Sequence, residues 1–160
     1  MMGGLLPPLM LCLALAFALA FVPRPVAVVS AATAAAGAVA IWSIGPPATW
    51  TEPVFVGCWV SVIATAALSY WPNGIPPRLA PIAAANAGLW AGAVSATAGS
   101  GIDLAVALVV VLLAIPGRLI IDSGGGIALK IASSWLIAVA ALAAMVSLTP
   151  TPGYAPDHMD

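Results

Sequence analysis

Proline, glycine and a few charged residues divide the chain into six apolar segments of about 18–22 residues each. A helix rises 1.5 Å per residue, so about 20 apolar residues cross the ~30 Å hydrocarbon core of a bilayer. Helices also satisfy their own backbone hydrogen bonds, which lipid cannot do. The pattern predicts an all-α bundle of about six transmembrane helices, over residues 5–22, 26–44, 54–71, 79–98, 102–121 and 127–148.

The composition excludes a large water-facing surface. Of the 160 residues, 63% are hydrophobic and only 6% are charged, whereas a soluble domain carries roughly 25% charged residues. We therefore expect residues 1–148 to form one transmembrane domain and residues 149–160 to form a short exposed tail. The expected partner is the lipid bilayer, because a net charge of −1 offers no basic surface for nucleic acid.

The basic residues predict the orientation of the chain. They stand at or beside the first, third and fifth breaks and are Arg24, Arg78, Arg118 and Lys130. Lys and Arg in short loops stay on the cytoplasmic side of a membrane. We expect these three loops to face the cytoplasm and both termini to face outward. The short loops suggest a bacterial inner (plasma) membrane.

The N-terminal segment has a second interpretation, because Ala18-Leu19-Ala20 resembles a signal-peptide cleavage site. A cleaved signal carries its positive charge before the apolar run, whereas here Arg24 follows it. We therefore expect the segment to be retained as a helix. The first break, Pro23-Arg24-Pro25, is so short that it predicts a hairpin of the first two helices.

Small residues on the fourth segment predict close helix packing. Ala84, Gly88, Gly92 and Ala96 recur every four residues, and Gly88–Gly92 is a GxxxG step that lets two backbones approach. The second segment offers a small face made of Ala31, Ala32, Thr33, Ala35, Ala36, Gly37 and Ala40. We expect the second and fourth helices to be central. The contact could lie within one chain or between two copies.

Three polar residues are candidates for a role at membrane depth or at a mouth: Asn86, Asp103 and Lys130. Asn86 near the middle of its segment predicts an interhelical hydrogen bond or a solute ligand. Asp103 fits a capping box with Ser100 better than an ion site, and Thr49 with Glu52 predicts the same cap for the third segment. Lys130 could reach water along its own helix, pair with Asp122, or bind a substrate carboxylate.

The chain has few residues that could act in catalysis or bind a metal ion. The one histidine, His158, lies in the tail beside Asp157 and Asp160, where a rigid four-ligand metal site is not expected. Cys12 and Cys58 lie within apolar segments and are expected to be free and buried. Without an acid, base or nucleophile set in the membrane we expect no enzyme activity, no metal and no cofactor.

Three classes of function remain. The first is a transporter or exporter of a small solute, or a membrane subunit of one, acting with a second copy or partner. The second is a non-catalytic structural subunit of a membrane complex. The third is a pore former of the holin type, although no segment carries the polar stripe that would line a water-filled pore. The first class is favoured by the close-packed small residues and by Asn86 at depth.

Overall fold

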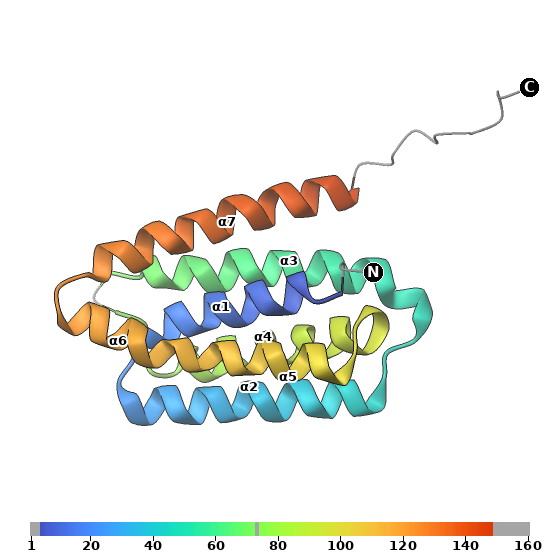
Figure 1. The fold of residues 1–160 in the computed structure, drawn as a ribbon, viewed down its shortest axis with the longest axis horizontal. Coiled ribbons are helices and arrows are strands. Elements are labelled where there is room, and N and C mark those ends of the chain that lie inside the picture. Colours follow the sequence, from blue (N-terminus) through green and yellow to red (C-terminus); the bar gives the residue numbers. More distant parts are fainter. Residues whose placement is uncertain (1–3, 73, 149–160) are drawn as a thin grey trace, which may run out of the picture.

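A computed structural model describes residues 4–72 and 74–148, and every element in these ranges is helical (Figure 1). The α-helices are α1 (Leu6–Ala20), α2 (Arg24–Ile44), α3 (Thr51–Ala67), α4 (Leu79–Ala98), α5 (Gly101–Val110), α6 (Ala114–Asp122) and α7 (Gly126–Leu148). Three 3₁₀ turns extend or join them: η1 (Ala48–Trp50), η2 (Leu68–Tyr70) and η3 (Val111–Leu113). The predicted all-α bundle is confirmed.

Five helical stretches in the described ranges are long and apolar enough to cross a bilayer. They are Arg24–Ile44, Thr51–Tyr70, Leu79–Ala98, Gly101–Asp122 and Gly126–Leu148. The remaining helix, α1, has 15 residues and is therefore about 22 Å long. The chain is thus a multi-pass membrane protein in which α1 does not reach the usual spanning length.

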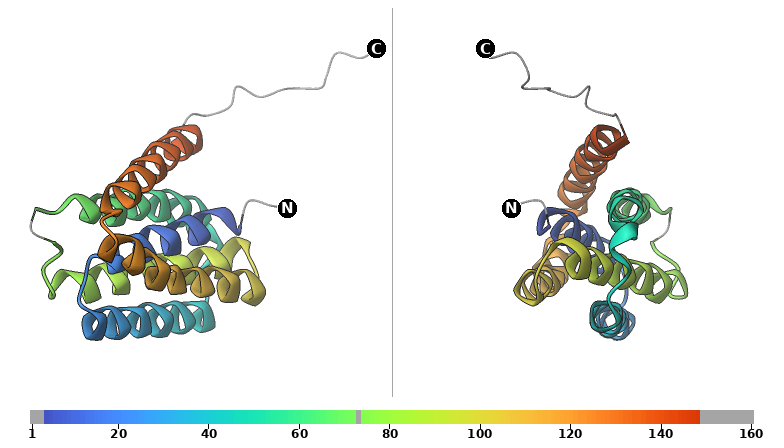
Figure 2. Two further views of the ribbon diagram at one scale, coloured as in Figure 1. Left: turned by 60° about the vertical axis from the view of Figure 1, so that its left-hand side comes forward. Right: turned by 90° about the vertical axis from the view of Figure 1, so that its right-hand side faces the viewer.

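The core of the bundle is α1. It packs against α3, α4, α5 and α6, and side chains such as Leu11, Leu15 and Ala18 are almost completely buried. The prediction that the second and fourth helices are central is therefore wrong for α2, since only 17% of its most apolar stretch is buried within the bundle. Figure 2 shows α2 and α7 on opposite sides of the bundle. Because neighbouring helices surround α1, little of this short helix is left to face lipid.

The close contact predicted from the GxxxG step is made within one chain, between α2 and α4. A Cβ on Gly88 would come closer than 3.0 Å to the backbone of Ala34, and one on Gly92 would clash with Ala38 in the same way. The buried residues of α2 are Ser30, Ala34 and Ala38. Ala84, Gly88 and Gly92 are buried on α4, and Ala96 is half-buried.

Two details of the α2 prediction are wrong. The small face proposed for the second segment omitted all three residues that α2 buries, because nearly every side of this helix is small and hydrophobicity does not distinguish them. The first two helices do not form a packed hairpin either, since α2 packs along α4 and scarcely touches α1. Tight glycine contacts with α4 outweigh proximity along the chain.

The fifth predicted segment is a helix interrupted by a single 3₁₀ turn. α5 ends at Val110, η3 covers Val111–Leu113, and α6 continues from Ala114. Pro116 lacks an N–H and cannot bond the carbonyl four residues earlier, Leu112, so the backbone tightens there. Gly117 follows, where a Cβ would lie 3.1 Å from Cβ of Ala20, so α6 comes close to the end of α1.

The basic residues gather at one end of the bundle, which we call the basic end. Arg24 begins α2, Arg78 precedes α4, Arg118 lies near the end of α6, and Lys130 lies in the first turns of α7. These helix ends lie together at the left of Figure 1. Here α7 is tied to η2, because Ser133 donates to Ser69 at 3.2 Å and Tyr70 donates to the carbonyl oxygen of Lys130.

Candidate functional site

A groove between α3 and α4, together with η2, has a volume of about 620 Å³. This lies within the ~300–1,000 Å³ typical of small-molecule sites. Its walls are mostly apolar and contain no ionisable side chain. The lining residues are Gly57, Val60, Ser61, Ala64, Thr65, Leu68, Leu79, Ile82, Ala83, Asn86 and Trp90. We call it the α3–α4 groove.

Three polar side chains form a hydrogen-bonded chain in this groove. The Nδ2 of Asn86 donates to Oγ of Ser61 at 3.0 Å, and Nε1 of Trp90 donates to Oδ1 of Asn86 at 3.1 Å. Asn86 is the eighth residue of α4, and Ser61 is the eleventh residue of the stretch Thr51–Tyr70. The chain of bonds therefore lies near mid-depth and links two helices, where such bonds typically contribute about 0.6–2 kcal/mol.

Gly57 positions the indole ring of Trp90. A Cβ at Gly57 would come closer than 3.0 Å to three carbons of that ring, so the ring packs directly on the backbone of α3. Trp90 follows Asn86 by four residues and shares its helix face. A side chain at Gly57 would displace this ring, whose Nε1 bonds Asn86.

Asn86 keeps hydrogen-bonding capacity beyond these two bonds. A carboxamide has two N–H donors and two acceptor lone pairs on its oxygen. The two bonds to Ser61 and Trp90 use one donor and one lone pair. The half-buried side chain lines the groove, so the second donor and the second lone pair are available to a molecule inside it. Such an arrangement can bind and orient a neutral polar group, but it holds no acid or base.

The structure does not bring the three predicted polar candidates together. Asp103 lies in the first turn of α5 and Lys130 in the first turns of α7, and these helices begin at opposite ends of the bundle (Figure 1). Asn86 lies between the two ends. The three residues therefore cannot form one site in this structure.

Asp103 forms the predicted capping box. Its Oδ2 accepts from the backbone N–H of Ser100 at 2.8 Å, while its own N–H donates to Oγ of Ser100 at 3.3 Å. The same prediction is wrong for the third segment, because α3 begins after η1 with Trp50 at the cap position and no side-chain cap bond from it. The 3₁₀ turn leads directly into α3 and takes the place of the predicted box.

Lys130 is not the partner of Asp122. The carboxylate of Asp122 pairs instead with Nε of Arg118 at 3.1 Å, one helical turn away in α6. The backbone of Lys130 is engaged through its carbonyl oxygen, which accepts from Tyr70. Its side chain is half-buried at the basic end, where the stem can lie on apolar surface and the ammonium can reach water.

Within residues 4–72 and 74–148, no three His, Cys, Asp or Glu side chains gather into a group that could hold a metal ion. Cys12 and Cys58 are free and buried, as their apolar surroundings predicted. The acidic tail with His158 lies outside the described residues.

Sequence reasoning found Asn86 but missed its surroundings. Trp90 follows Asn86 by four residues, which places both on one face of α4, but the spacing alone does not identify a hydrogen bond between them. Ser61 and Gly57 carry no signal in the sequence, because a serine and a glycine are common in membrane helices.

The chain matches no known family model, and no match was found among curated proteins or among solved structures.

Proposed function

We propose that this multi-pass membrane protein is a transporter or exporter of a small solute, or the membrane subunit of one, and that the solute binds in the α3–α4 groove. The observation that supports this most is Asn86 at mid-depth, with one donor and one lone pair left over in a cavity of about 620 Å³. Hydrogen-bonding groups at this depth are costly unless something satisfies them.

The lining of the groove favours an uncharged solute. None of its lining residues is ionisable, so a charged molecule would be desolvated without a counter-charge. The free donor and lone pair of Asn86 can bond one neutral polar group of a solute, such as an amide or a hydroxyl. Val60 and Ile82 would contact the apolar part of the same solute. The indole of Trp90 adds an aromatic wall. A neutral, partly apolar molecule is therefore the proposed substrate class.

The absence of an ionisable group in the groove also bears on the mechanism. A carrier driven by protons or another ion gradient needs a group that binds the ion, and the lining of the groove offers no carboxylate for it. We therefore propose either facilitated movement of the solute or coupling through a second subunit. The proposed location is a bacterial inner membrane with the basic end in the cytoplasm, following the position of Arg24, Arg78 and Arg118.

A second candidate, a non-catalytic subunit of a membrane complex, is favoured by the distal part of α7. The fully buried residues of this helix end at Ala140, and beyond it Ala143 and Ala144 are partly buried against the core. Leu142 is 67% exposed and Leu148 is 63% exposed, so a partner helix could pack there. Purification in mild detergent distinguishes the two candidates, since a structural subunit is recovered with a larger partner and a self-sufficient carrier is recovered alone or as a homo-oligomer.

Thermal melting tests the proposed solute site. The purified chain is melted with a panel of neutral amides, polyols and small aromatic alcohols, because a ligand that binds only the folded state raises its melting temperature. We expect at least one compound to raise the melting temperature of the wild type and to have no effect on Asn86→Leu. The matched control is Leu89→Ala, at an exposed position of α4 outside the groove, which should keep the shift. A shift that survives in Asn86→Leu would place the solute elsewhere.

A further inference from the structure

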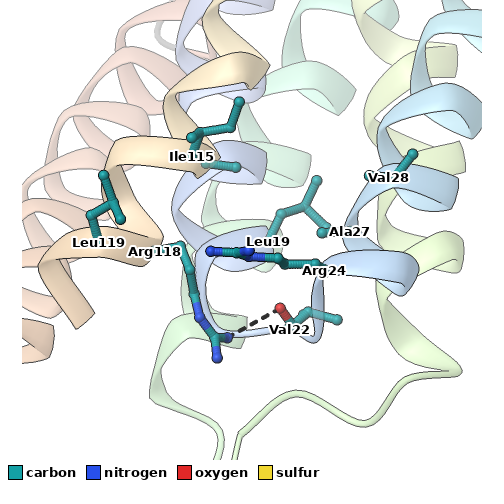
Figure 3. Close-up of a pocket in the computed structure, with 9 residues that line it drawn as sticks. Leu19, Val22, Arg24, Ala27, Val28, Ile115, Arg118 and Leu119 are labelled. Carbon is teal, nitrogen blue, oxygen red and sulfur yellow. Dashed lines mark hydrogen bonds between the residues drawn. The ribbon is translucent and has the colours of Figure 1, made fainter. Parts of the chain in front are cut away.

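A second groove lies at the basic end, between the start of α2, the end of α1 and α6 (Figure 3). Its volume is about 210 Å³ and its walls are almost wholly apolar, formed by residues such as Leu19, Val28, Ile115 and Leu119. Two guanidinium groups, from Arg24 and Arg118, stand at this groove. We call it the arginine groove. It shares no lining residue with the α3–α4 groove.

The two arginines differ in how far their charge is compensated. Arg118 pairs with Asp122 and donates through Nη1 to the carbonyl oxygens of Val22 at 3.3 Å and Ala20 at 3.4 Å. Arg24 is exposed, and its side chain makes no hydrogen bond or ion pair with the described part of the chain. Figure 3 shows Arg24 extending across the groove from α2 toward α6. Two positive groups thus face one groove, and a single carboxylate offsets them.

The start of α2 adds to the positive potential. Its cap residue is Pro23, which provides no side-chain acceptor for the free N–H groups of the first turn. The first N–H groups of a helix carry partial positive charge and favour an anion nearby. Arg24 stands at this helix start. The groove therefore combines an anion-attracting mouth with apolar walls, of which Val28, Ile115 and Leu119 are largely exposed.

From this juxtaposition we infer that the arginine groove binds an anionic phospholipid of the leaflet at the basic end. The phosphodiester pairs with the guanidinium groups of Arg24 and Arg118, and part of an acyl chain lies along Val28 and Ile115. Arginine matches phosphate geometry through paired N–H donors. A volume of 210 Å³ holds a section of a lipid chain, while the rest of the lipid stays in the bilayer.

Native mass spectrometry of the full chain in detergent tests this assignment, with phosphatidylglycerol and phosphatidylcholine as probes. The wild type should retain phosphatidylglycerol in preference to phosphatidylcholine. Arg24→Gln should weaken phosphatidylglycerol binding roughly fivefold, since one basic residue near anionic lipid contributes about 1 kcal/mol. Arg78→Gln is the matched control, because Arg78 is also an exposed arginine beside a helix start at the basic end but does not line the groove.

A second pair of variants tests the acyl chain. Val28 lines the groove, whereas Val29 is exposed on the same helix outside it. Val28→Trp should reduce phosphatidylglycerol retention and Val29→Trp should not. Equal retention of the two lipids by the wild type, or equal effects of Arg24→Gln and Arg78→Gln, would overturn the assignment. Binding of inorganic phosphate that displaces the lipid while Val28→Trp has no effect would also overturn it, since it would indicate a simple anion site.

Discussion

The backbone of Ala34 in α2 occupies the space that a Cβ on Gly88 in α4 would need. Ala38 and Gly92 repeat this contact one turn further along. At both positions the backbones of the peripheral helix α2 and of α4 are in direct contact. Apart from this extensive contact with α4, α2 makes few contacts with the bundle. These glycines therefore set how closely α2 packs against α4.

Gly88→Ala should lower the free energy of unfolding by about 1–3 kcal/mol, because the methyl group would force α2 and α4 apart. Gly37→Ala is the control, since a Cβ there would lie 3.8 Å from the carbonyl oxygen of Ala85, an ordinary contact. It should be neutral or slightly stabilising, because alanine favours a helix more than glycine does. Thermal unfolding in mild detergent measures both. Equal melting temperatures for the two variants would contradict the α2–α4 contact.

Arg118→Gln should destabilise the core helix. It removes the charged donor that caps the end of α1 at the carbonyl oxygens of Ala20 and Val22. The expected loss is about 1–2 kcal/mol in the free energy of unfolding, typical of a cation at a helix C-terminus and of hydrogen bonds from a charged group. Asp122→Asn breaks only the ion pair with Arg118 and should cost about 0.5 kcal/mol or less. If Asp122→Asn costs as much as Arg118→Gln, the cap is not the source of the stability.

Gly57→Ala should move the indole of Trp90 out of its position on α3 and break its bond to Asn86. The contribution of Trp90 to the tryptophan emission, obtained by subtracting the spectrum of Trp90→Phe, should shift in wavelength. The same Gly57→Ala change in a Trp90→Phe background should leave the remaining emission unchanged. A shift that persists without Trp90 would mean that the substitution acts on another tryptophan.

Ser100→Ala should lower the free energy of unfolding by about 1 kcal/mol, because it removes the side-chain cap of α5. Thr49→Ala tests the cap that the sequence suggested and the structure lacks, so it should change stability by less than about 0.5 kcal/mol. Chemical unfolding of both variants in detergent gives the comparison. A larger loss of stability for Thr49→Ala than for Ser100→Ala would contradict the cap positions that the structure assigns to α3 and α5.

The sequence was sufficient to predict the helical class and the bundle, because apolar length between Pro and Gly breaks depends on local physics alone. It also predicted the GxxxG contact and the Ser100–Asp103 box, both of which are short-range patterns. Packing partners could not be predicted. The central position of α1 follows from which faces meet in space, and a helix that is apolar all round gives no periodic signal of the face it buries.

The same limit applies to the candidate site. Asn86 stands out in the sequence because it is polar at mid-depth, but Ser61 lies 25 residues away on another helix, and no periodic pattern links them. Gly57 could not be recognised as the contact of Trp90 without the crossing of α3 and α4. The arginine groove depends in the same way on α2 and α6 meeting at the end of α1.

Thiol labelling of Val60→Cys tests the central claim, that the α3–α4 groove receives a solute, most directly. A charged, membrane-impermeant methanethiosulfonate reagent reacts with thiolates, which form only in contact with water. The wild type should stay unlabelled, because Cys12 and Cys58 are buried. Val139→Cys, at an exposed mid-depth position of α7 outside the groove, is the lipid-facing control. We predict that Val60→Cys is labelled from at least one side of the membrane and Val139→Cys from neither. Val60→Cys as unreactive as Val139→Cys would mean that water does not reach the groove, and would contradict the proposed function.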